Sequence, residues 1–200
     1  ILKDYKKALT RYADSMKELH VTYECSLTDF ETVKEAADVQ IEGDSIVRQM
    51  RMVKDEGELV QIREMFTCAS DSFSASLDSF KPGLKEVVWA AELEKNMKIN
   101  GAKSPSFDTI IGSGVRSALP HGIASEKIVD NGDAVVVDFG AKKQYCSDVT
   151  RLVMTEDDTD VAIIADIVYT ALSKAMEKVK SGVKCSEIDA AARYYIEYKG

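Results

Sequence analysis

The sequence predicts an α+β fold in which helices are grouped beside an antiparallel sheet. Between about residues 55 and 99, apolar residues recur at three- and four-residue steps, the period of amphipathic helices. Between about residues 107 and 154, short β-branched runs replace that period, and after residue 159 the helical period returns. The order of two helices, then strands, then two helices favours a layered α+β arrangement over a doubly wound one.

The chain is expected to contain two parts: residues 1–44, the end of a small α/β domain with its linker, and residues 45–200, a second domain. Apolar residues at helical spacing predict a helix over residues 1–20. His20 would end that helix, where the helix dipole favours a cation. We therefore interpret His20 as structural.

Short secondary-structure elements are predicted for residues 21–44. Residues 21–25 form a β-rich run, and Thr28 or Asp29 is expected to cap a helix over residues 30–37. Residues 42–44, Glu-Gly-Asp, predict a turn.

Two helices are predicted over residues 55–80 and 84–99. The first carries these residues on one face: Leu59, Ile62, Met65, Phe66, Ala69, Phe73 and Leu77. It ends at the Lys-Pro-Gly of residues 81–83. The second is expected to direct these residues inward: Val87, Val88, Ala91 and Leu93. It ends at Asn100-Gly101, a usual C-terminal stop.

Strands follow. Residues 107–111 are short and β-branched, residues 134–137 are an uninterrupted apolar run, and residues 145–154 form a second extended run. We expect the last two to pair as a hairpin. Helices over residues 159–180 and 185–198 complete the pattern.

Two aspartates in this hairpin are candidate metal ligands. Asp138 ends the apolar strand, where an unpaired carboxylate is costly, and Asp148 lies ten residues later in the return strand. A hairpin centred near Lys143 would place them side by side, and a divalent cation such as Mn²⁺, Mg²⁺, Co²⁺ or Zn²⁺ would relieve their repulsion. An exposed acid pair without a ligand explains the spacing equally well, but the apolar run before Asp138 favours the metal. Thr150, on the same strand face, either supports a ligand or faces solvent.

His121 is a candidate catalytic residue. It lies in the irregular segment 116–122, Arg-Ser-Ala-Leu-Pro-His-Gly, where Pro120 fixes the backbone and Gly122 allows a close approach. An imidazole there can stabilise a developing oxyanion, or it can cap its own loop. The sequence contains no Gly-x-Ser-x-Gly elbow, P-loop or Gly-x-Gly-x-x-Gly motif, so covalent-nucleophile and nucleotide chemistry lack support.

The composition disfavours some classes of binding partner. A net charge of −8 and a pI near 4.9 disfavour nucleic acid and anionic membranes, and no run of about eighteen apolar residues is present. The four cysteines lie far apart without a Cys-x-x-Cys pair, which predicts reduced thiols and a cytoplasmic protein. Because the chain begins Ile-Leu-Lys without Met, we expect a fragment.

Four segments occur in the order typical of one family: RMVKDE opening a long helix, then GSGVRSALPHGIAS, GDAVVVDFG and YCSDVTR. Over about residues 45–200 the chain resembles the Xaa-Pro dipeptidases (prolidases) and aminopeptidases P, which are pita-bread metallopeptidases. The resemblance implies a partial pita-bread (creatinase/aminopeptidase-like) fold. It also implies that residues 1–44 correspond to the end of the preceding N-terminal (creatinase-N-like) domain.

The resemblance implies a function as well. Asp138 would be held by one of two divalent metal ions (Mn, Co or Zn), Asp148 would bridge both, and His121 would stabilise the tetrahedral intermediate. The reaction would be metal-dependent hydrolysis of the peptide bond preceding proline, on a peptide substrate with proline in the second position. A homodimer is also implied.

The sequence departs from the family pattern in three ways. Members usually have eleven steps between the two aspartates rather than ten, so the missing residue must be absorbed in the turn or at a bulge. Leu152 stands where a threonine is usual. The family's histidine and two glutamate ligands follow the last helix, beyond Gly200, so we expect the 200-residue chain alone to be inactive.

Three alternatives stay open. A catalytically inactive pita-bread binding module has no reason to keep Asp138, Asp148 and His121. A methionine aminopeptidase shares the fold and the metal, but the loop of residues 116–122 favours the prolidase side. Metal-free, creatinase-like chemistry would leave both aspartates unexplained.

Overall fold

The computed structural model of the chain describes residues 19–22, 25–35, 39–42 and 46–199. It divides the chain into two compact units, residues 1–57 and 58–200. The helix predicted over residues 1–20 lies almost entirely outside the described residues. The boundary between the two predicted domains, between residues 44 and 45, stays a prediction.

The first unit contains a β-α-β arrangement of β1 (Leu19–Thr22), α2 (Leu27–Lys34) and β2 (Val39–Glu42), with the two strands paired in parallel. His20 lies in β1 rather than at the end of a helix, so that prediction is wrong. The strand forms because β2 pairs with it from about twenty residues away, a contact that local periodicity does not reveal. β2 itself was not predicted.

The cap of α2 also differs from the prediction. Ser26, not Thr28 or Asp29, is the N-cap residue, and its Oγ accepts a hydrogen bond from the backbone N–H of Asp29 at 3.1 Å. The helix therefore starts three residues earlier than expected.

Three helices follow: α3 (Ile46–Met52), α4 (Glu56–Leu77) and α5 (Glu86–Ile99). The second and third were predicted, and α5 ends at Asn100 with Gly101 at φ 101° as expected. The first was not: residues 53–55 interrupt the helix before α4 begins.

The inward faces of α4 and α5 differ in part from the predicted ones. Phe66 and Leu77 are 42% and 39% exposed, and Val87 and Val88 are exposed too. Met65, Ala69 and Leu93 are buried as predicted. The other buried residues of the two helices were not predicted: Cys68, Ser72, Ser76, Glu86, Trp89, Ala90 and Met97. A pattern of apolar residues does not detect buried polar ones such as Ser72, Ser76 and Glu86. Their side chains can be buried because they are hydrogen-bonded.

The main sheet has the antiparallel order β4 (Ile110–Ser113), β5 (Ala134–Phe139) and β7 (Val149–Met154). The predicted hairpin is thus confirmed as β5 and β7. A short pair, β3 (Ser104–Pro105) and β6 (Ala141–Lys142), extends its turn end. After β4 the chain forms a 3-10 helix, η1 (Gly114–Ala118).

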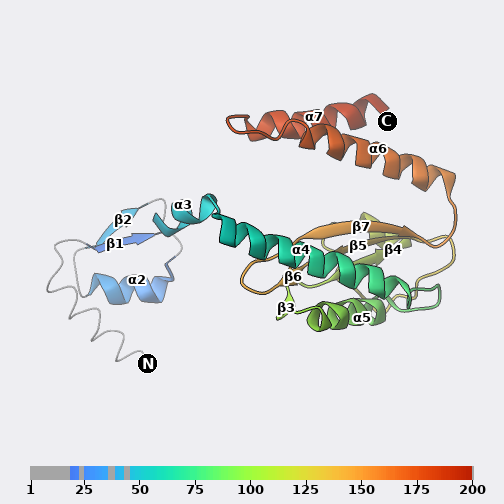
Figure 1. The fold of residues 1–200 in the computed structure, drawn as a ribbon, viewed down its shortest axis with the longest axis horizontal. Helices are drawn as coiled ribbons and strands as arrows, with labels where there is room; N and C mark the ends of the chain where they lie inside the picture. Colours follow the sequence, from blue (N-terminus) through green and yellow to red (C-terminus); the bar gives the residue numbers. More distant parts are fainter. Residues whose placement is uncertain (1–18, 23–24, 36–38, 43–45, 200) are drawn as a thin grey trace. The chain divides into compact units, whose positions relative to one another are not determined.

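The core lies between this sheet and helices α4 and α5, which Figure 1 shows beside it. Phe139 of β5 stacks on Phe73 of α4, with ring centroids 5.3 Å apart, and Trp89 of α5 lies 4.1 Å from Phe80. The core face of β5 carries Val135, Val137 and Phe139, all fully buried. Asp138 alternates to the other face and is half-buried, rather than mostly buried as expected.

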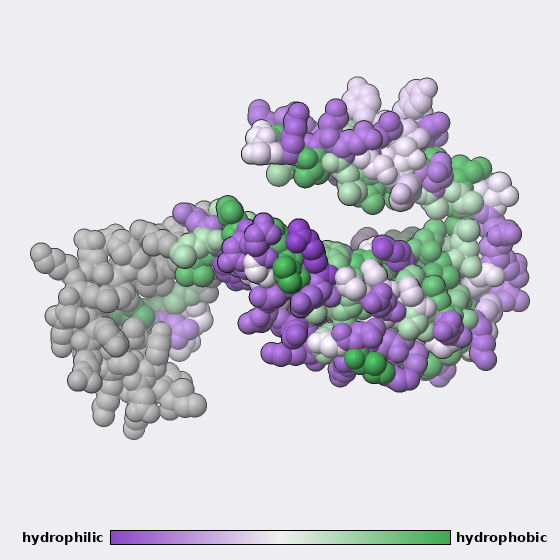
Figure 2. All heavy atoms as spheres, in the orientation of Figure 1, coloured by the Kyte–Doolittle hydropathy of each residue, from purple (hydrophilic) through white to green (hydrophobic). Residues whose placement is uncertain are grey.

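After β7 come the two predicted helices, α6 (Thr159–Met176) and α7 (Cys185–Lys199), which pack against each other. Hydrophobic residues gather on the surface over α6 (Figure 2). They include Ile163, Ile164, Val168, Leu172 and Met176, all exposed. Among the residues the structure describes, no helix has the length and apolarity needed to cross a membrane.

Candidate functional site

The β5–β7 register places the two aspartates on one face of the sheet. Asp138 pairs with Thr150, and the ladder ends one step later at Phe139 and Val149. Asp148 precedes β7 and lies two residues before Thr150, so its side chain takes the same face as those of Thr150 and Asp138. Asp138 and Asp148 are therefore diagonal neighbours.

The turn of the hairpin is centred on Gln144, not Lys143. Lys142 bridges Cys146, and the Lys143 N–H donates to the Tyr145 carbonyl at 3.0 Å. The expectation that the acids stand directly opposite each other is thus wrong by two residues, because Asp138 pairs with Thr150 and not with Asp148. The pairing keeps one register from Asp138 and Thr150 to Lys142 and Cys146, so both acids still share a face.

A close contact between the two strands of the hairpin sets the distance between them next to the aspartates. Gly140 is buried, and a Cβ there would overlap the carbonyl oxygen of Ser147. Ser106 Oγ lies 2.9 Å from the carbonyl oxygens of both Ala141 and Ser147, and the Ala141 N–H donates to Ser147 Oγ at 2.9 Å. The sequence analysis missed this contact, whose only signal was the glycine that ends GDAVVVDFG.

The surroundings of Asp138 disfavour its charge. Burial raises the pKa of Asp138, the hydrogen bond from Thr150 Oγ1 to its Oδ1 at 3.0 Å lowers that pKa, and the neighbouring Asp148 carboxylate raises it again. The net pKa is raised. A bound divalent cation would neutralise two such carboxylates, whose oxygens are the donors that hard cations prefer.

The two aspartates fit part of a metal site. Within the described residues there is no group of three or more His, Cys, Asp and Glu side chains placed to hold a metal. Asp138 and Asp148 would supply two carboxylate ligands of such a site, and Thr150 donates a hydrogen bond to Asp138.

The loop that carries His121 runs beside Asp138. Ile110 of β4 pairs with Asp138 on one side and bridges Ile123 on the other. His121 lies close enough for its charge to lower the pKa of Asp138. The structure therefore brings together the predicted residues Asp138, Asp148, Thr150 and His121.

The His121 side chain does not cap its own loop. Its imidazole is exposed and makes no hydrogen bond to any residue that the structure describes. Backbone bonds form the turn instead: Gly122 N–H donates to the Leu119 carbonyl at 3.2 Å and Ile123 N–H to the His121 carbonyl at 3.0 Å. The imidazole is thus available to a ligand.

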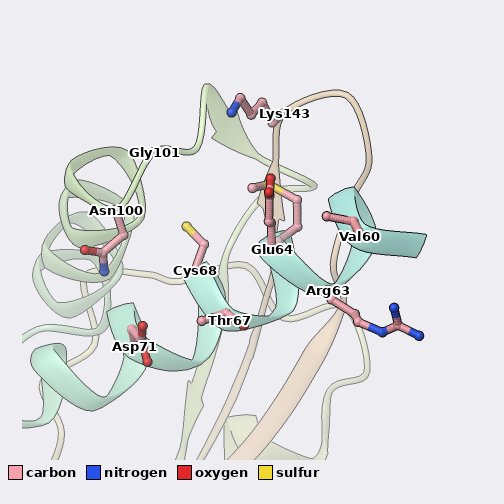
Figure 3. A pocket seen from close by; sticks show the side chains of 10 residues that line it. Val60, Arg63, Glu64, Thr67, Cys68, Asp71, Asn100, Gly101 and Lys143 are labelled. Carbon is pink, nitrogen blue, oxygen red and sulfur yellow. The ribbon is translucent and has the colours of Figure 1, made fainter. Parts of the chain in front are cut away.

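A separate cleft of about 520 Å³ lies between α4, the end of α5 and the hairpin turn (Figure 3). Arg63, Glu64, Asp71 and Lys143 line it, together with the thiol-bearing Cys68. None of the four predicted site residues lies in its wall. This cleft is therefore not the candidate site.

Sequence analysis also missed Glu86, which is fully buried in α5 and hydrogen-bonded to Ser113, Arg116 and Ser125. A glutamate in an amphipathic helix is expected to face solvent, so no local signal marks it.

Comparisons with known proteins identify the family and the fold. The sequence profile of metallopeptidase family M24 matches residues 60–200. An Xaa-Pro dipeptidase of Pyrococcus horikoshii is 43% identical over 159 residues, 78% of this chain and 45% of that protein. The chain spans about half the length of the relatives it matches.

Solved structures share the fold. The X-Pro aminopeptidase of Thermotoga maritima is 36% identical with a TM-score of 0.90, over 98% of this chain and 58% of that one. The prolidase of Pyrococcus furiosus is 33% identical with a TM-score of 0.87, over 96% of this chain and 58% of that one. The expected partial pita-bread fold of α+β class is thereby confirmed, and the chain belongs to metallopeptidase family M24.

Proposed function

We propose that the protein containing this chain hydrolyses the peptide bond preceding proline in Xaa-Pro dipeptides or longer peptides, in a metal-dependent reaction. The observation that carries the proposal is the placement of Asp138 and Asp148 on one face of the hairpin, with His121 close to Asp138. Membership of a metallopeptidase family supports the chemistry, and relatives named Xaa-Pro dipeptidase support the substrate.

Each residue receives a role in this proposal. Asp138 and Asp148 bind divalent metal (Mn, Co or Zn), and Thr150 orients the Asp138 carboxylate through its hydrogen bond. When bound, the metal supplies Lewis-acid activation of water and of the scissile carbonyl. His121 donates a hydrogen bond to the carbonyl oxygen of the substrate and stabilises the negative charge that develops there.

The proposal extends to partners and location. A peptide with proline in the second position is the substrate, and the protein acts as a homodimer in the cytoplasm. The four cysteines are free, which agrees with a reducing compartment. Size-exclusion chromatography with light scattering tests the dimer, and a monomeric mass would contradict it.

The alternatives receive less support. No observation favours a methionine aminopeptidase over the Xaa-Pro-specific relatives. An inactive binding module would not need the repelling pair Asp138 and Asp148 on one strand face. An inactive module would cleave no Xaa-Pro peptide, with or without divalent metal.

The test is an assay of the protein expressed from its complete reading frame. The metal-stripped protein is supplied with Mn²⁺, and an Xaa-Pro dipeptide is compared with the matching Xaa-Ala dipeptide. We expect metal-dependent cleavage of the Xaa-Pro substrate only. Asp148→Asn should lower it at least about 100-fold, because loss of an outer-shell partner alone costs about 10–100-fold.

Two further variants make the assay specific. Asp78→Asn, at an exposed position after α4, is the matched control and should retain wild-type activity. His121→Ala should lower kcat about 10²–10³-fold without changing the metal content, as loss of an oxyanion donor does. Undiminished cleavage by Asp148→Asn would overturn the ligand assignment.

A further inference from the structure

A buried carboxylate lies at the base of the loop that carries His121. Glu86, in the first turn of α5, has no exposed surface. Its Oε1 accepts hydrogen bonds from the N–H and the hydroxyl of Ser113, both at 2.8 Å. Its Oε2 accepts from Arg116 Nε at 3.1 Å and from the N–H and hydroxyl of Ser125 at 3.1 and 2.7 Å.

This carboxylate is charged despite its burial. Burial raises the pKa of Glu86, but the hydrogen bonds from Ser125 and Ser113 outweigh it, and the net pKa is lowered. Every donor that points at Glu86 therefore makes a charge-assisted hydrogen bond, stronger and more directional than a neutral one.

The partners of Glu86 lie at both ends of one loop and within it. Ser113 directly precedes η1, Arg116 lies in η1, and Ser125 follows the turn that contains His121. Arg116 also donates from its Nη2 to the Ile123 carbonyl at 2.7 Å, so the Glu86–Arg116 pair spans the loop across His121. The ends of segment 114–124 are thus held by a single carboxylate.

A second ion pair supports the same end of the loop. Lys127 Nζ donates to Ser113 Oγ at 2.9 Å and to Asp133 Oδ2 at 2.7 Å. Because Ser113 Oγ accepts the hydrogen bond from Lys127, its hydroxyl proton can be donated to Glu86. The cations Arg116 and Lys127 balance the two acids Glu86 and Asp133.

The charge at Glu86 is not explained by stability alone. Well-packed apolar residues usually stabilise a core as well as a buried ion pair does. A hydrogen-bonded network instead specifies one arrangement of the groups it joins. The His121 imidazole makes no hydrogen bond to the described residues, so its place depends on the backbone of this loop.

We propose that Glu86 is the positioning residue for His121: through Ser113, Arg116 and Ser125 its carboxylate holds segment 114–124 so that the imidazole stays beside Asp138. The catalytic half of this inference rests on the function proposed above for His121. The ordering of the loop by Glu86 does not depend on that function.

Glu86→Gln tests the proposal, because the amide keeps the shape of the side chain but directs N–H groups toward donors. Glu92→Gln is the matched control on the same helix, where the carboxylate is partly exposed and pairs with Lys95 at 2.8 Å. Hydrogen exchange of segment 114–125, followed by mass spectrometry, reads the ordering of the loop without any assay of activity. We expect protection there to fall about tenfold or more in Glu86→Gln only.

Kinetics then separate positioning from a general loss of structure. Glu86→Gln should lower kcat about 10²-fold with KM and metal content unchanged, because a small displacement of a catalytic group costs that much. In the His121→Ala background the same substitution should cost little more, since the two residues act through one interaction. Equal losses in both backgrounds would overturn the positioning role.

Two outcomes keep the tests distinct. Wild-type protein that cleaves no Xaa-Pro peptide would overturn the proposed function, whereas unchanged exchange of segment 114–125 in Glu86→Gln would overturn the inference. If Glu86→Gln does not fold, Ser125→Ala removes one of the five hydrogen bonds and should loosen the same segment to a smaller degree. Unchanged exchange in that variant would likewise overturn the inference.

Discussion

Gly140→Ala should separate the two strands that carry the aspartates. The added methyl group would overlap the Ser147 carbonyl oxygen and would lie 2.9 Å from its carbonyl carbon and 2.9 Å from Ser106 Oγ. Two of these atoms belong to the backbone of a buried residue, so they cannot move aside as a flexible side chain would. The hairpin must open to accommodate the substitution.

The size of the effect follows from these contacts. Forcing one extra carbon into a packed site costs about 1–3 kcal/mol. Opening the hairpin also weakens the Ser147 N–H bond to Ala141 at 2.9 Å and the Ser106 N–H bond to Gly140 at 2.8 Å, each contributing about 1 kcal/mol. We expect a loss of about 3–5 kcal/mol in the free energy of unfolding.

Denaturant unfolding at equilibrium, extrapolated to water, measures this loss. Gly57→Ala is the control: it makes the same change at an exposed position in the first turn of α4 and should be neutral or stabilising by up to about 1 kcal/mol. If the free energy of unfolding of Gly140→Ala lies within about 0.5 kcal/mol of the wild-type value, the close approach of Gly140 to Ser147 is refuted.

Three further predictions concern single side chains. Thr150→Val removes the hydroxyl that donates to Asp138 and should weaken divalent-metal binding about 10–100-fold by calorimetry, and unchanged affinity would contradict its role. Trp89→Phe loses the 3.2 Å bond from Nε1 to the Ser76 carbonyl and should destabilise the fold by about 1–3 kcal/mol in thermal unfolding, and an unchanged Tm would contradict this. Because the folded pKa of Glu86 is lowered from 4.5, its contribution to stability is present above that pH and is lost as pH falls through the folded pKa; acid titration should show this component in the wild type and not in Glu86→Gln.

Much of the fold was predictable because it depends on local pattern. The helix α5 has helical spacing and a stop at Asn100-Gly101, and both agree with the structure. The apolar run of β5 and the extended run of β7 are adjacent in sequence, so their pairing as a hairpin follows from a short turn.

The elements that were missed depend on contacts distant in sequence. β1 and β2 form by pairing with each other, which placed His20 in a strand rather than at a helix end. The inward face of α5 includes Glu86 and excludes Val87 and Val88 because the partners of Glu86 lie in three other segments. Apolar periodicity carries no information on such partners.

The candidate site shows the same division. Asp138 and Asp148 belong to one hairpin, so their proximity was predictable. The register depended on a turn centred on Gln144, and the expected partner of Asp138 was wrong by two residues. The proximity of His121 depends on Ile110, which joins its loop to β5. No spacing in the sequence reports that contact.

The most direct test of the central claim is a Mn²⁺ titration of the metal-stripped protein by isothermal calorimetry. The wild type, Asp138→Asn, Asp148→Asn and the control Asp78→Asn are compared at one pH. If the two hairpin aspartates bind metal, both substitutions within the hairpin will weaken or abolish Mn²⁺ binding and the control will not. Equal stoichiometry and affinity in all four proteins would contradict the assignment of Asp138 and Asp148 as ligands.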